Sequence, residues 1–599
     1  MYKVLSSIYH ACLLLCFFSV NPLGAVWSPD TTISPPSSDK AQIGIDGAGN
    51  AIAIWRMFDG FNTNIQSAIL PKGGSWSDAA TISSYSGYHT QCYPQIAVNC
   101  EGSAIAIWEE CKGAESTVRA TILPSDGEWS SPMDISKPSL KPGQVPQIAI
   151  NSSGYAVAVW KNYDGSRNMT EAATFQFGGN WSQPVAISSS IDTYVPQIAV
   201  ESSGNAVAVW LDVTNQTIQS ATLSFGKTWG LPINLSAGGS GNPQIQMNPS
   251  GYAVAIWERF VDSCFAVEAS TFQFGESWSA PIVVSTPESD AFQPDVAIDS
   301  DGNIIAVFGQ CSGSDIYVQA AQLPFGGSWT SPSTLSPAGA FSFDPNVVID
   351  GFGNAYAVWD RDNGYDVVVQ TSILPFGGEW SAPVDLSAYG QGAIFPKIAV
   401  DMTGYAVVDW TSNTMDVIQA AAWISAPTIT NVDPNAGSTS GGDSITIKGT
   451  NFINVTSVSF GSTGASFAVI SPTEIIATSP AGVPGVVDIT VITTAGTSSI
   501  SPNDQYTYQP LGSPPPAVAN VYPNNGLSIG GNPVRITGTN FDDVTQVSFG
   551  GNEALSFSVI SSTLIIATVP AGNPGPVDVT VTTNAGTSVT NSRDHYTYR

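Results

Sequence analysis

The chain has 599 residues, of which only 11% are charged, while glycine (57 residues) and proline (41 residues) are abundant. This composition is typical of many short strands joined by turns and excludes a mainly helical protein, and the 43% hydrophobic content excludes disorder over most of the length. Acidic residues outnumber basic ones 47 to 18, so nucleic acid and anionic membrane surfaces are not expected partners; the acidity fits a secreted protein kept soluble by its charge.

Residues 1–25 are predicted to be a signal peptide. Lys3 precedes an apolar stretch over residues 11–20, and Ala25 offers a small side chain at a plausible cleavage point. The apolar stretch is too short to span a bilayer comfortably, and we expect no transmembrane segment in the mature chain. The sequence therefore predicts an exported protein, secreted or held at the cell surface.

An internal repeat dominates the first 425 residues. The phrase at residues 196–210 ends on an aromatic side chain and returns about every 50 residues, and a second, tryptophan-centred phrase follows it in the same rhythm. The closing aromatic residues of the first phrase are Trp55, Trp108, Trp160, Trp210, Trp257, Phe308, Trp359 and Trp410, and the tryptophans of the second are Trp76, Trp129, Trp181, Trp229, Trp278, Trp329 and Trp380.

Each repeat contains four candidate strands, all β-branched or alanine-rich and bounded by turn residues. A short polar residue opens the turn between the first two strands, and glycine closes it, as at Asp46 and Gly49. Proline in the fourth strand, as at Pro184, predicts an edge position. Four antiparallel strands repeated many times are typical of a β-propeller; a solenoid is the alternative.

The ends of the repeat region favour a closed ring. Residues 27–34 form a fourth-strand phrase with no blade before it, whereas the last repeat, residues 396–423, has no fourth-strand phrase after it. Pairing the two would remove two exposed sheet edges. The predicted fold is therefore all-β, with an eight-bladed propeller over residues 26–425 that the N-terminal strand closes.

Loop lengths indicate which face of the propeller binds. The distance from the first strand to the closing aromatic residue is constant, as from Ile43 to Trp55, whereas the second-to-third and fourth-to-first connections vary in length and composition. Variable loops on a rigid frame are the usual place for binding. We expect a monomer that contacts an extracellular protein or glycan through this face, with the candidate ligand-binding residues Phe58, Phe61, Glu109, Tyr163, Glu258, Phe260, Asp360 and Arg361.

Little in the sequence suggests catalysis. Only three histidines occur (His10, His89 and His595), so a Ser-His-Asp triad or a histidine-rich metal site is not expected, and neither is a cofactor. Residues 299–303 resemble the start of a calcium loop but occupy the position of an ordinary turn. A glycosidase or lectin on the same face is the alternative function, with carboxylates drawn from Glu109, Glu110, Glu258, Asp360 and Asp362.

Five cysteines follow the predicted signal peptide. Their places in the repeat predict disulfides Cys92–Cys111 and Cys264–Cys311 and leave Cys100 free in a turn; unpaired buried thiols are the alternative.

The last 170 or so residues contain two copies of one unit, residues 426–510 and 516–599, joined by a proline-rich linker at 511–515. Strands of Val, Ile and Thr recur in each, as in a small β-sandwich. Pro434 to Gly437, the pair Gly441 and Gly442, and Gly449 to Phe452 resemble the core of the IPT/TIG family of immunoglobulin-like domains. That resemblance implies an immunoglobulin-like fold and no catalytic residue; a spacer role and a specific binding role both remain open.

Overall fold

The computed structural model describes residues 26–83, 90–189, 192–287, 289–424, 426–452, 455–493, 495–509 and 514–599. The predicted signal peptide and most of the predicted linker lie outside these residues. The described part of the chain is all-β, as predicted: it has no α-helix, and its one helical turn is the short 3-10 segment η1 (Pro502–Asp504). Across these same residues, no helix is long and apolar enough to cross a membrane.

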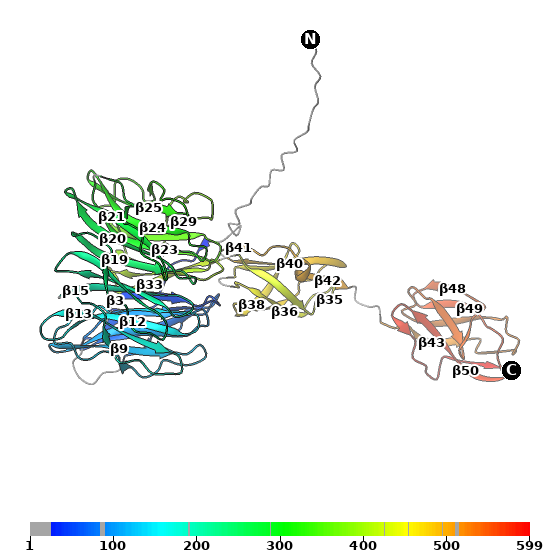
Figure 1. Ribbon diagram of the computed structural model, residues 1–599. Coiled ribbons are helices and arrows are strands. Elements are labelled where there is room, and N and C mark those ends of the chain that lie inside the picture. Colours follow the sequence, from blue (N-terminus) through cyan, green and yellow to red (C-terminus); the bar gives the residue numbers. More distant parts are fainter. Residues whose placement is uncertain are drawn as a thin grey trace, which may run out of the picture.

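The described residues between 26 and 424 form successive groups of four antiparallel strands, drawn in blue to green in Figure 1. In each group the chain runs outward from a first strand that packs against the first strands of its two neighbours. These groups are the blades of a β-propeller. The first strands are β3 (Ser38–Ile45), β7 (Thr90–Val98), β11 (Gln147–Ile150), β15 (Thr193–Val200), β19 (Ser240–Met247), β23 (Ala291–Ile298), β27 (Phe341–Ile349) and β31 (Ala393–Val400).

The second strands form the buried centre of each blade. In β16 the residues from Ala206 to Trp210 are all fully buried, because both faces of the sheet are covered by neighbouring blades. The indole Nε1 of Trp210 donates a hydrogen bond to Gln219 Oε1 on the third strand (3.1 Å), so this fixed aromatic residue is an internal packing residue. The second strands are β4 (Ala51–Phe58), β8 (Ala104–Lys112), β12 (Tyr155–Tyr163), β16 (Ala206–Asp212), β20 (Tyr252–Val261), β24 (Ile304–Ser312), β28 (Ala355–Asp362) and β32 (Ala406–Ser412).

The outer strands are held partly by serine side chains. The fourth strands are only two residues long, at the edge position that proline predicted, and beside them Ser188 Oγ accepts a hydrogen bond from the N–H of Thr170 (3.0 Å). The third strands are β5 (Thr63–Leu70), β9 (Glu115–Leu123), β13 (Asn168–Gln176), β17 (Thr217–Leu223), β21 (Cys264–Gln273), β25 (Asp315–Leu323), β29 (Val367–Leu374) and β33 (Val417–Ile424). The fourth strands are β6 (Ala80–Thr81), β10 (Met133–Asp134), β14 (Val185–Ala186), β18 (Ile233–Asn234), β22 (Ile282–Val283), β26 (Ser333–Thr334) and β30 (Val384–Asp385).

The predicted pairing of the N-terminal segment with the last repeat is confirmed. β1 (Val26–Trp27) and β2 (Thr31–Thr32) pair antiparallel with β33. Ser34 Oγ accepts a hydrogen bond from the N–H of Ile418 (2.7 Å), which reproduces across the seam the contact that Ser188 makes within its own blade. The N-terminal segment therefore takes the place of the missing fourth strand.

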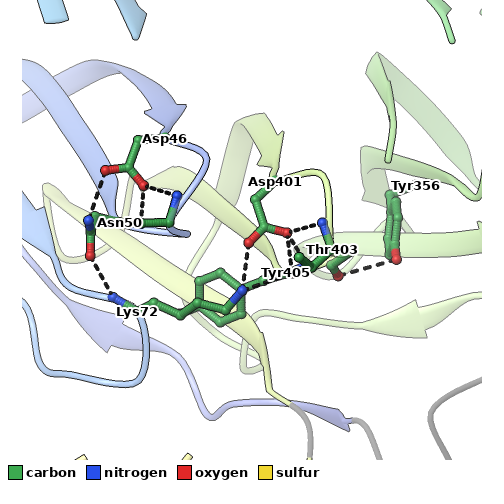
Figure 2. Close-up of polar contacts among 9 residues, drawn as sticks. Asp46, Asn50, Lys72, Tyr356, Asp401, Thr403 and Tyr405 are labelled. Atoms are coloured by element: carbon green, nitrogen blue, oxygen red, sulfur yellow. Dashed lines mark hydrogen bonds and ion pairs between the residues drawn. The ribbon is translucent and has the colours of Figure 1, made fainter. Parts of the chain in front are cut away.

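A polar network also joins the last blade to the first. This junction, the closing seam, is where the propeller ring closes. Lys72, in the β5–β6 loop, donates to Asp401 Oδ2 (2.6 Å) and Thr403 Oγ1 (2.8 Å) in the β31–β32 turn, and its ammonium lies 5.2 Å from the centre of the Tyr405 ring (Figure 2). Five other blades have phenylalanine where this one has lysine, and Phe225 packs edge-on against Tyr155 of the preceding blade. At the closing seam, the ion pair of Lys72 with Asp401 thus takes the place of an aromatic contact between neighbouring blades.

The C-terminal part consists of two β-sandwiches, yellow and red in Figure 1. The first has β34 (Thr428–Asp433), β36 (Ser444–Thr450), β39 (Glu474–Thr478) and β38 (Thr463–Ser471) along one side; its other strands are β37 (Ser457–Phe460), β40 (Gly485–Thr493), β42 (Gln505–Gln509), β35 (Ala436–Ser438) and β41 (Gly496–Thr497). Ala495, between β40 and β41, is buried against propeller residues that include Tyr405 and Ile424, so this domain contacts the closing seam.

The second sandwich repeats this arrangement around its own core, in which Tyr596 and Phe541 are fully buried. One side contains β43 (Ala517–Tyr522), β45 (Pro533–Thr539), β49 (Leu564–Thr568) and β48 (Ser556–Ser561). The other contains β44 (Asn525–Gly526), β52 (His595–Tyr598), β50 (Gly575–Thr583), β46 (Gln546–Phe549), β47 (Asn552–Glu553) and β51 (Gly586–Thr587).

Candidate functional site: the axial cavity

A bulge in seven of the eight first strands shapes the centre of the propeller; in the described part of the chain, β11 is the first strand without one. In β23 the register shifts between Phe292 and Asp295, and Gln293 adopts a positive φ of 50° just before Pro294. Proline has no N–H to give to the ladder, which suits it to a bulge. The corresponding residues with positive φ, within seven of the first strands and just before β11, are Lys40, Tyr93, Val145, Val195, Asn242, Gln293, Asp344 and Phe395.

The residue two positions after the bulge lines a cavity on the propeller axis. The cavity has a volume of about 590 Å³, within the range usual for small-ligand sites. Every blade contributes one side chain to this axial ring, and each of these side chains is half-buried. The ring members are Gln42, Gln95, Gln147, Gln197, Gln244, Asp295, Asn346 and Lys397.

Two of the ring members, Asp295 and Asn346, make hydrogen bonds from blade to blade. Asp295 Oδ2 accepts from Asn346 Nδ2 (2.5 Å) and from the N–H of Val347 (2.9 Å), and Asn346 Oδ1 accepts from the N–H of Ile398 (3.3 Å). Burial raises the pKa of Asp295, and the nearby Lys397 ammonium opposes that increase. This sector fixes the ring and gives it a charged edge, whereas the five glutamines on the remaining blades present uncharged amides.

Two further carboxyl groups lie behind this charged sector. Burial, together with the neighbouring Asp344 carboxylate, raises the pKa of Asp360 to about 7. Asp409 is fully buried, and neither of its carboxylate oxygens has a hydrogen-bond partner in the described part of the chain. Burial raises the pKa of Asp409 well above its usual value, with Lys397 opposing. Burial thus favours the protonated form of both carboxyl groups.

Three predicted ligand-binding carboxylates make structural contacts between blades. Glu109 Oε1 accepts from the N–H groups of Gly143 (2.6 Å) and Gln144 (3.1 Å) in the next blade. Glu258 Oε1 accepts from the N–H of the bulge residue Gln293 (2.7 Å). Asp360 Oδ2 accepts in the same way from Phe395 (3.3 Å). Glu258 and Asp360 thus accept from an N–H at the bulge of the next blade, and Glu109 accepts from two N–H groups just before β11.

The remaining predicted residues are dispersed over the variable face. Phe58 and Phe61 are exposed at the tip of the β4–β5 hairpin, and Phe260 is exposed two blades beyond Tyr163, against Phe265 with ring centres 5.2 Å apart. Tyr163 is half-buried beneath the Lys141 ammonium, which lies 3.9 Å from its ring centre.

Arg361 is half-buried in β28. These predicted residues come from alternate blades, so the structure does not gather them into one site.

Residues 299–303, which resemble the start of a calcium loop in sequence, form an ordinary turn, as expected. The N–H of Asn303 donates to Asp299 Oδ1 (2.8 Å), and Asn303 Nδ2 donates to Asp299 Oδ2 (2.7 Å). Both carboxylate oxygens are therefore used by the turn itself.

The predicted Cys264–Cys311 disulfide is not present: both residues have free thiols. Cys264 pairs with Val261 at the tip of the β20–β21 hairpin. Cys311 lies in the β24–β25 hairpin of the next blade, one residue pair away from the tip. The two cysteines therefore lie at different distances from the tips of their hairpins. Burial and the nearby Asp290 raise the pKa of the Cys311 thiol. The Cys92 side chain lies outside the described residues, so Cys92–Cys111 stays a prediction; Cys100 is an exposed free thiol.

Sequence reasoning missed the axial ring, although its signal is present. A proline followed by a polar residue and then Ile or Val opens seven of the eight first strands, and the polar residue is glutamine in four of those seven. The alternation of a strand places this residue away from the blade core, toward the axis.

The fold and the cavity define a class: a β-propeller with an amide-rich axial site, followed by two immunoglobulin-like domains. Residues 427–508 and 516–598 each match the family model of the IPT/TIG domain, so the C-terminal part consists of two IPT/TIG domains, as the motif predicted. No curated protein matches the sequence.

Several solved structures are similar in part. A protein of unknown function from Dyadobacter fermentans is 11% identical, with a TM-score of 0.32 over 50% of this chain and 98% of its own. An ulvan lyase of polysaccharide lyase family PL25 is 11% identical, with a TM-score of 0.39 over 53% of this chain and 89% of its own. An endo-arabinase from Bacteroides thetaiotaomicron is 11% identical, with a TM-score of 0.25 over 37% and 89%. These scores are too low to support an argument about function.

Proposed function

We propose that this protein is an extracellular binding protein whose propeller takes a neutral glycan chain into the axial cavity. The observation that carries the proposal is the axial ring, in which five of eight equivalent positions are glutamine. A carboxamide donates and accepts hydrogen bonds at once, which matches the hydroxyl groups of a sugar. The net charge of −29 disfavours a polyanionic chain.

The two IPT/TIG domains act as spacer or interaction modules that fit an extracellular protein. Their resemblance to surface-protein modules and the predicted signal peptide support export.

A glycan array probed with the full chain tests the proposal. Gln197→Leu and Gln244→Leu remove two uncharged ring members without altering a blade contact described above, and each should weaken binding about tenfold, as expected for the loss of one well-placed polar contact. Phe61→Ala, at an exposed hairpin tip, is the matched control and should bind nearly as well as wild type. Unchanged binding by both ring variants, together with loss in Phe61→Ala, would place the ligand on the hairpin tips instead and contradict the cavity.

A carbohydrate-active enzyme is the second candidate, because Asp344 and Asp360 form a coupled pair of carboxyl groups with raised pKa values beside the cavity. Chromatography of array-positive glycans after incubation with the protein decides between the two candidates. New glycan ends that disappear in Asp360→Asn, while binding persists, would establish the enzyme; intact glycan would support the binding protein.

A further inference from the structure

Three potential metal ligands meet at one end of the second IPT/TIG domain. Asp578 in β50 lies directly opposite His595 in β52, and His595 Nε2 is 2.9 Å from Asp578 Oδ1. Asp594 immediately precedes β52, and one donor atom from each of the three residues lies within 4.8 Å of the others. The strand pairing, rather than any local motif, brings Asp578 to the other two residues.

One of these ligands is a buried carboxylate with an unused oxygen. Asp594 is completely buried; its Oδ2 accepts a hydrogen bond from the N–H of Asn591 (2.6 Å), whereas Oδ1 has no hydrogen-bond partner among the described residues. A buried acceptor without a partner is costly and therefore rare. A cation at this point would supply that partner.

We infer that Asp578, Asp594 and His595 bind a divalent transition metal, with Zn²⁺ the best match. An imidazole and two carboxylates are ligands that Zn²⁺ accepts, and three protein ligands leave one tetrahedral position for water. Metal–ligand distances of about 2.0–2.2 Å place tetrahedral donors about 3.3–3.6 Å apart, so metal binding would draw together donor atoms that now lie within 4.8 Å of one another. The side chains of His595 and Asp578 are 50% and 46% exposed, so the ion can enter from solvent.

The first IPT/TIG domain provides a natural comparison. Its equivalent residues are Asp488, Asp504 and Gln505: Asp488 again lies opposite position 505, and Asp504 again is fully buried with Oδ1 lacking a partner in the described residues. The two domains thus share the turn and the carboxylate oxygen without a partner, and they differ in that only the second domain has the imidazole of His595. Only the second domain should therefore bind the metal.

The full chain is titrated with Zn²⁺ alone by calorimetry, and bound metal is counted after dialysis. Wild type should bind one zinc ion at this site, and His595→Gln, which copies the first domain at an exposed position, should weaken this binding at least about tenfold. Gln505→His, which copies the second domain, should add one further ion. Replacing zinc with Co²⁺ separates this site from the cysteine thiols, because thiolate ligands give a charge-transfer band that oxygen and nitrogen ligands do not.

Zinc binding that is absent in wild type, or equal in wild type and His595→Gln, would overturn the inference. So would a Co²⁺ spectrum whose only bound form shows thiolate ligation. Retained circular dichroism of His595→Gln confirms that a loss of metal reflects the missing ligand.

Discussion

Lys72 Nζ lies 2.6 Å from Asp401 Oδ2 across the closing seam of the propeller, although the two residues are 329 positions apart in the chain. The Asp401 side chain is fully buried, whereas that of Lys72 is 32% exposed. Removing the lysine would leave a buried carboxylate without its counter-charge, which is the costly way to break such a pair.

Lys72→Phe should therefore destabilise the propeller, even though phenylalanine is the residue at this position in five other blades. We expect a loss of about 1–3 kcal/mol in urea unfolding, because the partial exposure of Lys72 weakens the pair. Adding Asp401→Asn, the residue type found at Asn151 and Asn248, should recover most of that loss. A single variant as stable as wild type would contradict the role of this pair.

The N-terminal segment should matter far more than any one of its hydrogen bonds. Ser34→Ala should cost about 1 kcal/mol, the same as the matched variant Ser188→Ala within an intact blade, because each removes one serine acceptor. Deleting residues 26–34 should lower Tm markedly and promote oligomers through the exposed edge of β33. Calorimetry and size-exclusion chromatography measure both effects. An unchanged, monomeric melt after deletion would contradict closure.

Asp360 should make stability fall as pH rises. Its pKa is about 7 in the folded protein and near 3.8 without burial, so the folded state binds the proton more tightly than the unfolded state. The contribution of Asp360 is therefore fully present below about pH 4 and is lost as pH rises through about 7, by at most about 4 kcal/mol. Asp360→Asn should flatten this part of the pH profile in urea unfolding, whereas the exposed control Asp78→Asn should not.

Asp409 occupies a position that is Ile or Val in every other blade, including Ile54, Val209 and Ile256. Its buried carboxyl has a raised pKa and no hydrogen-bond partner in the described chain, so Asp409→Val should stabilise the protein. The increase in the free energy of unfolding should be larger at pH 8 than at pH 4.5. The reason is that the Asp409 carboxyl group ionises readily in the unfolded chain, whereas burial opposes its ionisation in the folded protein. Unfolding at both pH values measures it. A destabilised variant would indicate that Asp409 has a partner or a functional use.

Glu109 should behave as a structural acceptor. Glu109→Leu leaves the N–H groups of Gly143 and Gln144 without their acceptor and should cost about 1–3 kcal/mol, whereas Glu109→Gln keeps an oxygen in place and should cost much less. The exposed control Glu115→Leu should be neutral. Glycan binding is measured on the same variants to separate a structural role of Glu109 from direct contact with a ligand. Loss of glycan binding in a Glu109→Gln variant that is as stable as wild type would favour direct contact.

Much of the fold follows from local pattern. The recurring Ala-Val-Ala-Val-Trp phrase of residues 206–210 predicted a strand buried on both faces, and the structure buries all five residues. The turn that begins at Asp299 and the strand phrase that ends at Ser34 could also be predicted from sequence, because turns and strand alternation depend on residues that are neighbours in the chain. The Cys264–Cys311 bond was mispredicted because a disulfide needs a distance, which spacing alone does not give.

The repeated strands, the two IPT/TIG units and the N-terminal strand phrase could be predicted from sequence, because each is a pattern of residues near one another in the chain. Which side chains share a site depends on how the strands pack in three dimensions. Gln42 and Gln244 face one cavity because the ring brings distant first strands to one axis, and Asp578 meets His595 because β50 pairs with β52. Glu109 and Asp360 were predicted as ligand residues from their places in the chain, and the structure shows that each also accepts a hydrogen bond from the backbone of the next blade.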